Sequence, residues 1–248
     1  MSKPRKMLDT KNESLDKVRD IGVRKKMHPH DLRSFRALTS GQEEFLRLFY
    51  QQTPFTTLHG FAGTGKTFIA MAAALSEVFE PSSPYEKLTI VRSAVEVRGI
   101  GFLPGTAEEK LEVYEQPYKS ILKELMNFKE PYEMAKQLGY IEFVPTSFLR
   151  GTTFNDQIVI VDECENLDYK ELVTVVTRAG ANCKIVFVGD DEQSDLFRQR
   201  QQSGFENLRK VLAEMPDDLV GMVEFSVEDI VRSRLVAEFI KAESRLKK

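Results

Sequence analysis

A glycine-rich segment between two apolar runs is the feature that most restricts what this chain can fold into. The segment "GFAGTGKT", from Gly60 to Thr67, follows the strand-like "TTLH" and precedes the helix-like "FIAMAAALSEVF". Its glycines permit tight backbone angles, so successive amides can point inward at phosphate oxygens. The segment matches the G-x-x-x-x-G-K-[ST] pattern. It predicts a nucleoside triphosphate site rather than an accidental glycine-rich turn, because a strand and a helix flank it.

The residue types of this loop have separate expected roles. Lys66 should reach the β- and γ-phosphates, and the Thr67 hydroxyl should ligate Mg²⁺. The helix that begins at Lys66 adds a partial positive charge at its N-terminus. We expect the nucleotide contacts to come from Gly60, Phe61, Ala62, Gly63, Thr64, Gly65, Lys66, Thr67 and Phe68.

Two later apolar runs end in polar residues. "QIVIVDE" ends in Asp162 and Glu163, and such residues project from the carboxyl edge of a parallel sheet, where ligands bind. Asp162 is expected to hold Mg²⁺ through its water shell, and Glu163 to activate a water molecule for hydrolysis. Alone, this pair could be the solvated end of a core strand, but the upstream loop favours a Walker B element. "KIVFVGDDEQSD" contains Gln193, which predicts a sensor of the nucleotide state.

The order of apolar runs and helical patterns predicts the fold class. Near-continuous apolar strands that alternate with helices indicate an α/β fold with a mostly parallel sheet and helices on both faces. We expect residues 1–37 to form a basic, partly disordered arm and residues 38–248 to form one domain. The strand-like runs are "FTTLHG", "KLTIVRS", "YIEFVP", "QIVIVDE", "KIVFVGD" and the weaker "GMVEFSV".

Charge and cysteine content indicate which partners and which cellular compartment to expect. The net charge of -3 combines +6 over residues 1–37 with -9 over the remainder. The basic arm could contact nucleic acid phosphates or could be a solvated leader. No apolar run approaches the roughly 18 residues of a membrane span, and the N-terminus does not resemble a secretory signal. Cys164 and Cys183 lack metal-ligand spacing, so we expect a cytoplasmic protein without disulfides.

Several segments together resemble the PhoH-like proteins, P-loop ATPases named for phosphate-starvation induction and related to superfamily 1 helicase cores. The chain looks like the short, phage-type form, because residues 1–37 are too few for the N-terminal domain of longer bacterial members. The resemblance implies a RecA-like core that binds and hydrolyses ATP with Mg²⁺. The matching segments are "GFAGTGKT", "VRSAVEVRGIGFLPG", "EKLEVYEQPYKSIL", "FLRGTTFNDQIVIVDECEN", "VGDDEQSDL" and "DIVRSRLV".

The resemblance carries further roles to single positions. Gln42 is similar to the glutamine that reads adenine in helicase-like ATPases, although it could also be an exposed helical glutamine. Arg232 matches the arginine of the family's closing element, and Arg234 stands where proline is typical, so either arginine could reach phosphate. Cys164, Glu165 and Ser93 are other departures, since the family usually has alanine, glutamine and proline there.

A motor ATPase needs an arginine that stabilises charge on the γ-phosphate. With one nucleotide site in the chain, Arg232 or Arg234 would act in cis or in a neighbouring subunit of a ring-like homo-oligomer such as a hexamer. Single-stranded RNA or DNA would contact Arg92, Arg98 and Phe102. Alternatively, Arg92 pairs with Glu96 and Phe102 is buried. Arg150 and Gly151 could bind nucleic acid or only shape a loop.

Three functions remain open from the sequence. The first is a nucleic-acid-stimulated ATPase, with helicase activity as one form. The second is an ATP-dependent assembly switch or scaffold without strand-separating activity, and Glu163 and Gln193 argue against it. The third is a small-molecule kinase, for which an arginine-rich lid segment is missing from the sequence.

Overall fold

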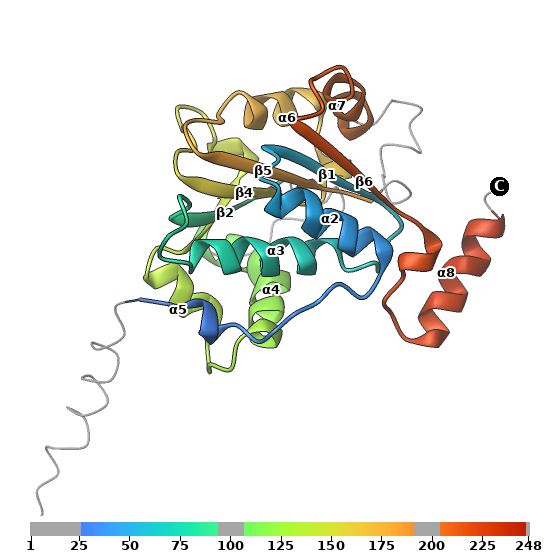
Figure 1. The fold of residues 1–248 in the computed structure, drawn as a ribbon, viewed down its shortest axis with the longest axis horizontal. Helices are drawn as coiled ribbons and strands as arrows, with labels where there is room; N and C mark the ends of the chain where they lie inside the picture. The colour runs from blue at the N-terminus through green and yellow to red at the C-terminus, as the bar shows by residue number, and fades with distance from the viewer. Residues whose placement is uncertain (1–25, 94–106, 191–203, 247–248) are drawn as a thin grey trace, which may run out of the picture.

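The computed structural model of the chain describes residues 26–93, 107–190 and 204–246 (Figure 1). Within these residues, six strands form one sheet in the order β3-β2-β4-β5-β1-β6, and every pairing is parallel. This confirms the predicted α/β fold with a RecA-like core, and each predicted apolar run overlaps one strand. The strands are β1 Phe55–Gly60, β2 Lys87–Arg92, β3 Ile141–Pro145, β4 Gln157–Val161, β5 Cys183–Val188 and β6 Val220–Phe225.

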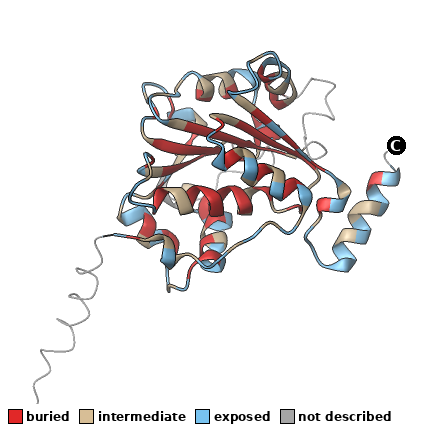
Figure 2. Cartoon of the chain, viewed as in Figure 1, coloured by how far each residue is buried: buried red, intermediate tan, exposed pale blue. Residues whose placement is uncertain are grey.

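Helices cover both faces of the sheet, as predicted (Figure 1). One face packs against α2, α3, α4 and α5, and the other packs against α6 and α7. The central strands are buried on both sides because they are apolar along most of their length (Figure 2). The helices are α2 Ser40–Tyr50, α3 Lys66–Val78, α4 Ala107–Leu125, α5 Pro131–Gln137, α6 Tyr169–Val176, α7 Gly204–Leu212 and α8 Arg234–Leu246.

The strand order brings the predicted motifs to one edge of the sheet. Strand β5 lies between β1 and β4, with Leu58 opposite Val188 and Val161 opposite Phe187. The glycine-rich loop after β1, the acid pair after β4 and Asp190 after β5 therefore leave neighbouring strands at their carboxyl ends. Parallel α/β sheets bind ligands at this edge.

The described end of the predicted basic arm lies on the domain. Met27 is buried, and Leu32 forms an isolated antiparallel bridge with Met126 after helix α4. The Arg33 amide donates to the Leu125 carbonyl over 2.7 Å. These contacts hold Met27, Leu32 and Arg33 against the domain, and the division at residue 37 stays a prediction. Residues 1–25 lie outside the described range.

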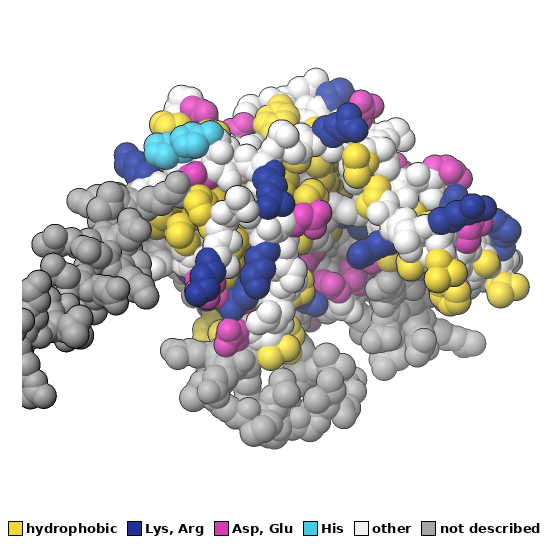
Figure 3. All heavy atoms as spheres, turned by 90° about the horizontal axis from the view of Figure 1, so that it is seen from below, with side chains coloured by type: hydrophobic (Ala, Val, Ile, Leu, Met, Phe, Trp, Pro, Cys, Tyr) yellow, Lys and Arg dark blue, Asp and Glu magenta, His cyan; other side chains and the backbone are white. Residues whose placement is uncertain are grey.

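Helix α8 stands apart from the sheet, beside the carboxyl ends of the strands (Figure 1). Leu235, Phe239 and Leu246 are 81%, 68% and 88% exposed and share one face of the helix. Hydrophobic side chains accordingly gather over α8 in the space-filling view (Figure 3). We call Leu235, Phe239, Ala242 and Leu246 the α8 stripe. A bilayer-crossing helix was not found among the described residues.

Candidate nucleotide-binding site

The loop from Gly60 to Thr67 has the backbone shape that its glycines permit. Gly60 and Gly65 have φ values of 116° and 78°, which favour glycine. A Cβ atom on Gly60 would lie 2.1 Å from the carbonyl oxygen of Phe225, so β6 approaches too closely for any side chain there. Gly65 is the N-cap of α3, which directs the first turn of the helix at the loop. The loop therefore presents amides and a helix N-terminus to one cavity.

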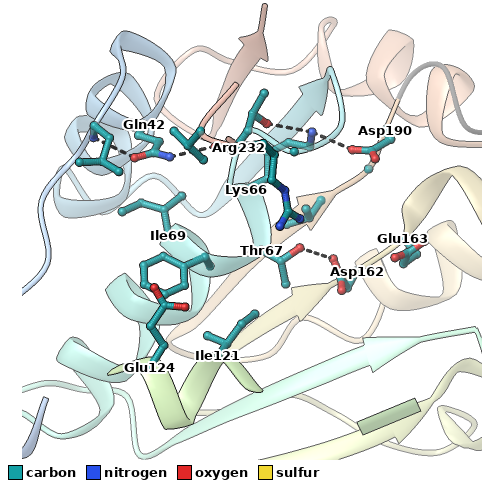
Figure 4. A pocket seen from close by; sticks show the side chains of 18 of the residues that line it. Gln42, Lys66, Thr67, Ile69, Ile121, Glu124, Asp162, Glu163, Asp190 and Arg232 are labelled. Atoms are coloured by element: carbon teal, nitrogen blue, oxygen red, sulfur yellow. Dashed lines mark hydrogen bonds and ion pairs between the residues drawn. The ribbon is translucent and has the colours of Figure 1, made fainter. Parts of the chain in front are cut away.

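Lys66 extends into this cavity and is 5% exposed (Figure 4). Its Nζ donates to the Phe61 carbonyl over 2.6 Å and to the Thr64 hydroxyl over 3.2 Å. It also forms an ion pair with the Asp190 carboxylate at 2.7 Å. A buried ammonium needs such partners to offset its loss of hydration. The lysine is thus held at the loop by groups that an anionic ligand can replace.

The predicted metal ligands meet across two elements. The Thr67 hydroxyl donates to Asp162 Oδ1 over 2.9 Å (Figure 4). The Tyr118 hydroxyl donates to Asp162 Oδ2 over 2.8 Å. Burial, followed by the Glu163 charge, raises the pKa of Asp162, while the two hydroxyl bonds oppose this shift. The donor set, a hydroxyl beside a buried carboxylate, suits Mg²⁺, which prefers oxygen ligands.

Glu163 is the next residue and has a left-handed backbone with φ 55°. This conformation is strained for a residue with a side chain and is typical of functional positions. One Glu163 oxygen accepts from Asn166 Nδ2 over 3.2 Å, and the other lies 3.5 Å from Arg92 Nη2. Arg92 therefore pairs with the acid pair, and its sequence-based alternative partner, Glu96, lies outside the described residues.

The strand after the acid pair contributes Asp190. Its amide donates to Glu165 Oε2 over 3.0 Å, and its carboxylate pairs with Lys66. Burial is the main cause that raises the pKa of Glu165, to about 8, and the Glu163 and Asp190 charges add to it. Gln193, the predicted sensor, lies outside the described residues. Asp190 and Glu165 were not predicted as site residues.

Gln42 lies in helix α2 and is 3% exposed, so the alternative of an exposed helical glutamine is wrong. Its Nε2 donates to the Thr64 carbonyl over 2.9 Å, and its Oε1 accepts from the Leu38 amide over 2.9 Å. Both atoms of the amide therefore bind backbone, one of them on the glycine-rich loop. The cavity beside Gln42 is also lined by Arg36, Leu38 and Phe68, and adenine recognition by Gln42 stays a prediction.

The closing segment places one of the two candidate arginines at the loop. The Val231 amide donates to the Gly63 carbonyl over 3.1 Å, and a Cβ on Gly63 would lie 3.0 Å from Arg232 Cγ. Arg232 lines the cavity of its own chain. Arg234 begins α8, is exposed and is not among the lining residues. The segment between β6 and Arg232 is anchored by Asp229, whose carboxylate accepts hydrogen bonds from the amides of Gly41 and Ser226.

The remaining predicted residues lie apart from this cavity. Arg150 and Gly151 are exposed, are not among the lining residues and have a φ of 82° at the glycine. Arg98 and Phe102 lie outside the described residues. A group of three or more His, Cys, Asp or Glu side chains that could together hold a metal ion was not found in the described part of the chain.

The cavity has a volume of about 490 Å³, within the usual range for ligand sites. Its lining combines the glycine-rich loop with a buried lysine, a Thr67–Asp162 pair and Arg232, so the residues fit a magnesium-bound triphosphate. The strand–loop–helix unit at the carboxyl edge of a parallel sheet and this site together define a P-loop nucleotide-binding protein.

A family model described as "PhoH-like protein" matches residues 34–244, and the chain belongs to this family. The chain is 42% identical over 152 residues to Protein PhoH2 of Bacillus subtilis, which covers 60% of this chain and 34% of the relative. It is 32% identical over 187 residues to Protein PhoH of Escherichia coli, which covers 75% and 51%. The chain thus spans between a third and a half of these two relatives.

Among solved structures, the large terminase of bacteriophage HK97 is similar with a TM-score of 0.49 and 10% identity. The similarity covers 86% of this chain and 48% of the terminase.

Proposed function

We propose that the chain is a Mg²⁺-dependent ATPase whose hydrolysis is stimulated by single-stranded nucleic acid. The observation that carries the proposal is that Lys66, the Thr67–Asp162 pair, Glu163 and Arg232 all line one cavity. A protein that only binds the nucleotide needs Lys66 and the Thr67–Asp162 pair. The added carboxylate and arginine are the groups that activate water and stabilise the transition state.

Each residue has a defined task in this reaction. The loop amides and Lys66 bind the β- and γ-phosphates, and the lysine exchanges its Asp190 partner for them. Thr67 and Asp162 would hold Mg²⁺, which would supply positive charge beside the phosphates. Glu163 orients water and accepts its proton. Arg232 stabilises the charge that develops on the γ-phosphate, and its place in its own chain's cavity supports action in cis.

The nucleic acid part of the proposal has two supports. The first is the positive charge of residues 1–37, which suits a phosphate backbone. The second is Arg92, which lies beside Glu163 at the end of β2. Helicase activity is the stronger form of the same proposal, and an assembly switch is its alternative. The setting we propose is the cytoplasm, in line with the free thiols of Cys164 and Cys183.

The test is ATP turnover with single-stranded RNA, single-stranded DNA and duplexes. We expect a basal rate that rises with a single strand. Glu163→Gln should lower kcat by about 10²–10⁴-fold while Mg·ATP binding remains. Turnover that Glu163→Gln leaves unchanged would contradict hydrolysis at this site. Nucleotide-dependent changes in molar mass without turnover would favour the assembly switch.

We also propose a homo-oligomer, and the α8 stripe supports it. Three of its four residues are large apolar side chains that are more than two-thirds exposed, and a short helix gains most of its stability from packing. Phe239→Ser should therefore lower the molar mass in solution. Mixing Lys66→Ala chains with Arg232→Ala chains tests the arginine: recovered turnover would show action in trans, and no recovery agrees with cis.

A further inference from the structure

Arg92 contacts the acid pair from a side that the nucleotide cavity does not use. It is the last residue of β2, which pairs with β4, and the Asp162 amide donates to the Val91 carbonyl over 2.9 Å. The backbone thus places Arg92 beside Asp162 and Glu163. Arg92 is not among the residues that line the nucleotide cavity, whereas both acids are. An anion that reaches Arg92 would therefore come from outside the nucleotide site.

The Arg92 side chain joins three groups. Its Nη2 lies 3.5 Å from Glu163 Oε1, its guanidinium is hydrogen-bonded to the Tyr118 hydroxyl, and its Cζ lies 6.0 Å from the Tyr114 ring centre. Burial disfavours the charged form, but Tyr118, Glu163 and Asp162 together raise the pKa of Arg92. The guanidinium is therefore a fixed positive charge held between helix α4 and the acid pair.

The ion pair with Glu163 is weak enough to be exchanged. The Arg92 and Glu163 side chains are 21% and 39% exposed, and ion pairs that water reaches contribute little to stability. The left-handed backbone of Glu163 is set by the turn into Cys164–Asn166, so the carboxylate moves mainly by side-chain rotation. Arg92 on one oxygen and Asn166 on the other thus set which way this carboxylate points.

The pair also affects what Glu163 can do. The Glu163 oxygen that pairs with Arg92 is turned toward the end of β2, so the carboxylate is less available to orient a water molecule. A second anion that binds the guanidinium would release the carboxylate for the water molecule.

We propose that Arg92 is a positioning residue that restrains Glu163, and that a backbone phosphate of single-stranded nucleic acid relieves this restraint by binding Arg92. The inference rests on the proposed ATPase function and supplies its regulation. Phosphate is the expected anion because it is negatively charged, as Glu163 is, and can accept two parallel N–H donors from an arginine. The Glu163 oxygen lies 3.5 Å from Arg92 Nη2, so a phosphate would bind the guanidinium more closely. RNA and DNA share this phosphate.

The test compares Arg92→Gln with wild type in ATP turnover, with and without single-stranded RNA or DNA. We expect the basal kcat to rise by about two- to five-fold, as loss of a partly exposed ion pair allows. The ratio of stimulated to basal rate should fall toward one. The salt dependence of nucleic acid binding should lose a slope of about one, which corresponds to one phosphate contact. Arg92→Lys should keep part of the stimulation.

Lys87→Gln is the matched control. Lys87 begins the same strand, and its ammonium pairs with Glu142, far from the acid pair along β2. It should leave the basal rate and the ratio unchanged. An Arg92→Gln protein with the wild-type ratio, or with a lower basal rate and the same ratio, would overturn the inference. Stimulation by RNA alone or by DNA alone identifies the source of the phosphate.

The two proposals fail in different ways. A folded wild-type protein that binds Mg·ATP without turnover refutes the ATPase function. A wild-type protein that hydrolyses ATP and is stimulated, beside an Arg92→Gln protein stimulated equally, refutes only the restraint. A lower melting temperature of Arg92→Gln with an unchanged ratio assigns Arg92 a structural role and also refutes the restraint.

Discussion

Helices α3 and α8 both contact the phosphate-binding loop, but they differ in how they are held. In α3, nine of 13 residues are buried, and the helix begins at Lys66. In α8, Ser244 is the buried residue, and the helix meets the loop through the segment around Arg232 and through Ile240. The glycine-rich loop and Lys66 are therefore part of the core, whereas Arg232 lies in the exposed segment that joins Val231 to α8.

This difference suggests a division of tasks. A binding site built on a buried helix is preorganised and costs little to order when the ligand arrives. An exposed helix with an apolar stripe can shift when a partner covers it. We infer that nucleotide binding depends mainly on the glycine-rich loop and α3, while hydrolysis depends also on where the segment before α8 holds Arg232.

The largest expected effect separates binding from hydrolysis at the α8 end. Arg232→Ala should lower kcat by about 10³-fold, because an arginine at the γ-phosphate contributes about 10³–10⁵ to the rate. Mg·ATP affinity should change by much less. Arg234→Ala, which removes an arginine that does not line the cavity, should have a far smaller effect on kcat. Equal losses for the two variants would contradict the assignment.

A pair of core and surface substitutions measures the difference in packing. Leu75→Ala in α3 removes a fully buried side chain and should destabilise the protein by about 2–5 kcal/mol. Leu235→Ala in α8 should change the free energy of unfolding by about 0.5 kcal/mol or less. Denaturant unfolding of dilute protein gives both values. A large loss for Leu235→Ala would mean that α8 is packed in solution.

Tyr118→Phe tests how the metal ligand is held. The change removes the hydroxyl that donates to Asp162 Oδ2 but keeps the buried ring. Loss of a partner behind a metal ligand typically costs about 10–100-fold in metal affinity, so more Mg²⁺ should be needed for half-maximal turnover. Turnover measured against Mg²⁺ concentration checks this. The same Mg²⁺ requirement as in wild type would show that Tyr118 only packs.

Glu165→Gln should have the smallest effect, and one that depends on pH. The pKa of Glu165 is about 8 in the folded protein, above its ordinary value near 4.5. Between these values the folded state keeps a proton that the unfolded chain has lost, so the free energy of unfolding falls as pH rises through this window. Glutamine stays neutral, so the variant should be more stable than wild type by about 1–3 kcal/mol at pH 9.

At pH 4 the difference between Glu165→Gln and wild type should be near zero, since both folded and unfolded wild type are then protonated. Unfolding by denaturant at the two pH values provides the comparison. A difference that does not grow between them would show that burial does not hold the Glu165 proton.

Sequence patterns predicted the fold because each strand is a short apolar run with helical segments between the runs. They also predicted the loop, since Lys66 and Thr67 are fixed by local backbone geometry. The contact of Tyr118 with Asp162 and the pairing of Arg92 with Glu163 were not predicted. Tyr118 is 44 residues from Asp162, and an amphipathic helix pattern does not say which buried tyrosine meets which carboxylate.

Gln42 is a second residue whose contacts could not be predicted from the sequence. The resemblance suggested that Gln42 reads adenine, but the sequence could not decide between an exposed and a buried side chain. The structure buries it because its amide joins the Thr64 carbonyl, a contact across 22 residues. Contacts between elements, rather than the elements themselves, are what the sequence left open.

The most direct measurement is calorimetric titration of Mg·ATP into wild-type protein and into Lys66→Ala. The central claim is that a core-built loop and its lysine bind the triphosphate. It predicts saturable binding by wild type and an affinity about 10–100-fold weaker for Lys66→Ala, because charge-assisted hydrogen bonds to phosphate are lost. Equal affinities in two proteins that unfold at the same temperature would contradict it.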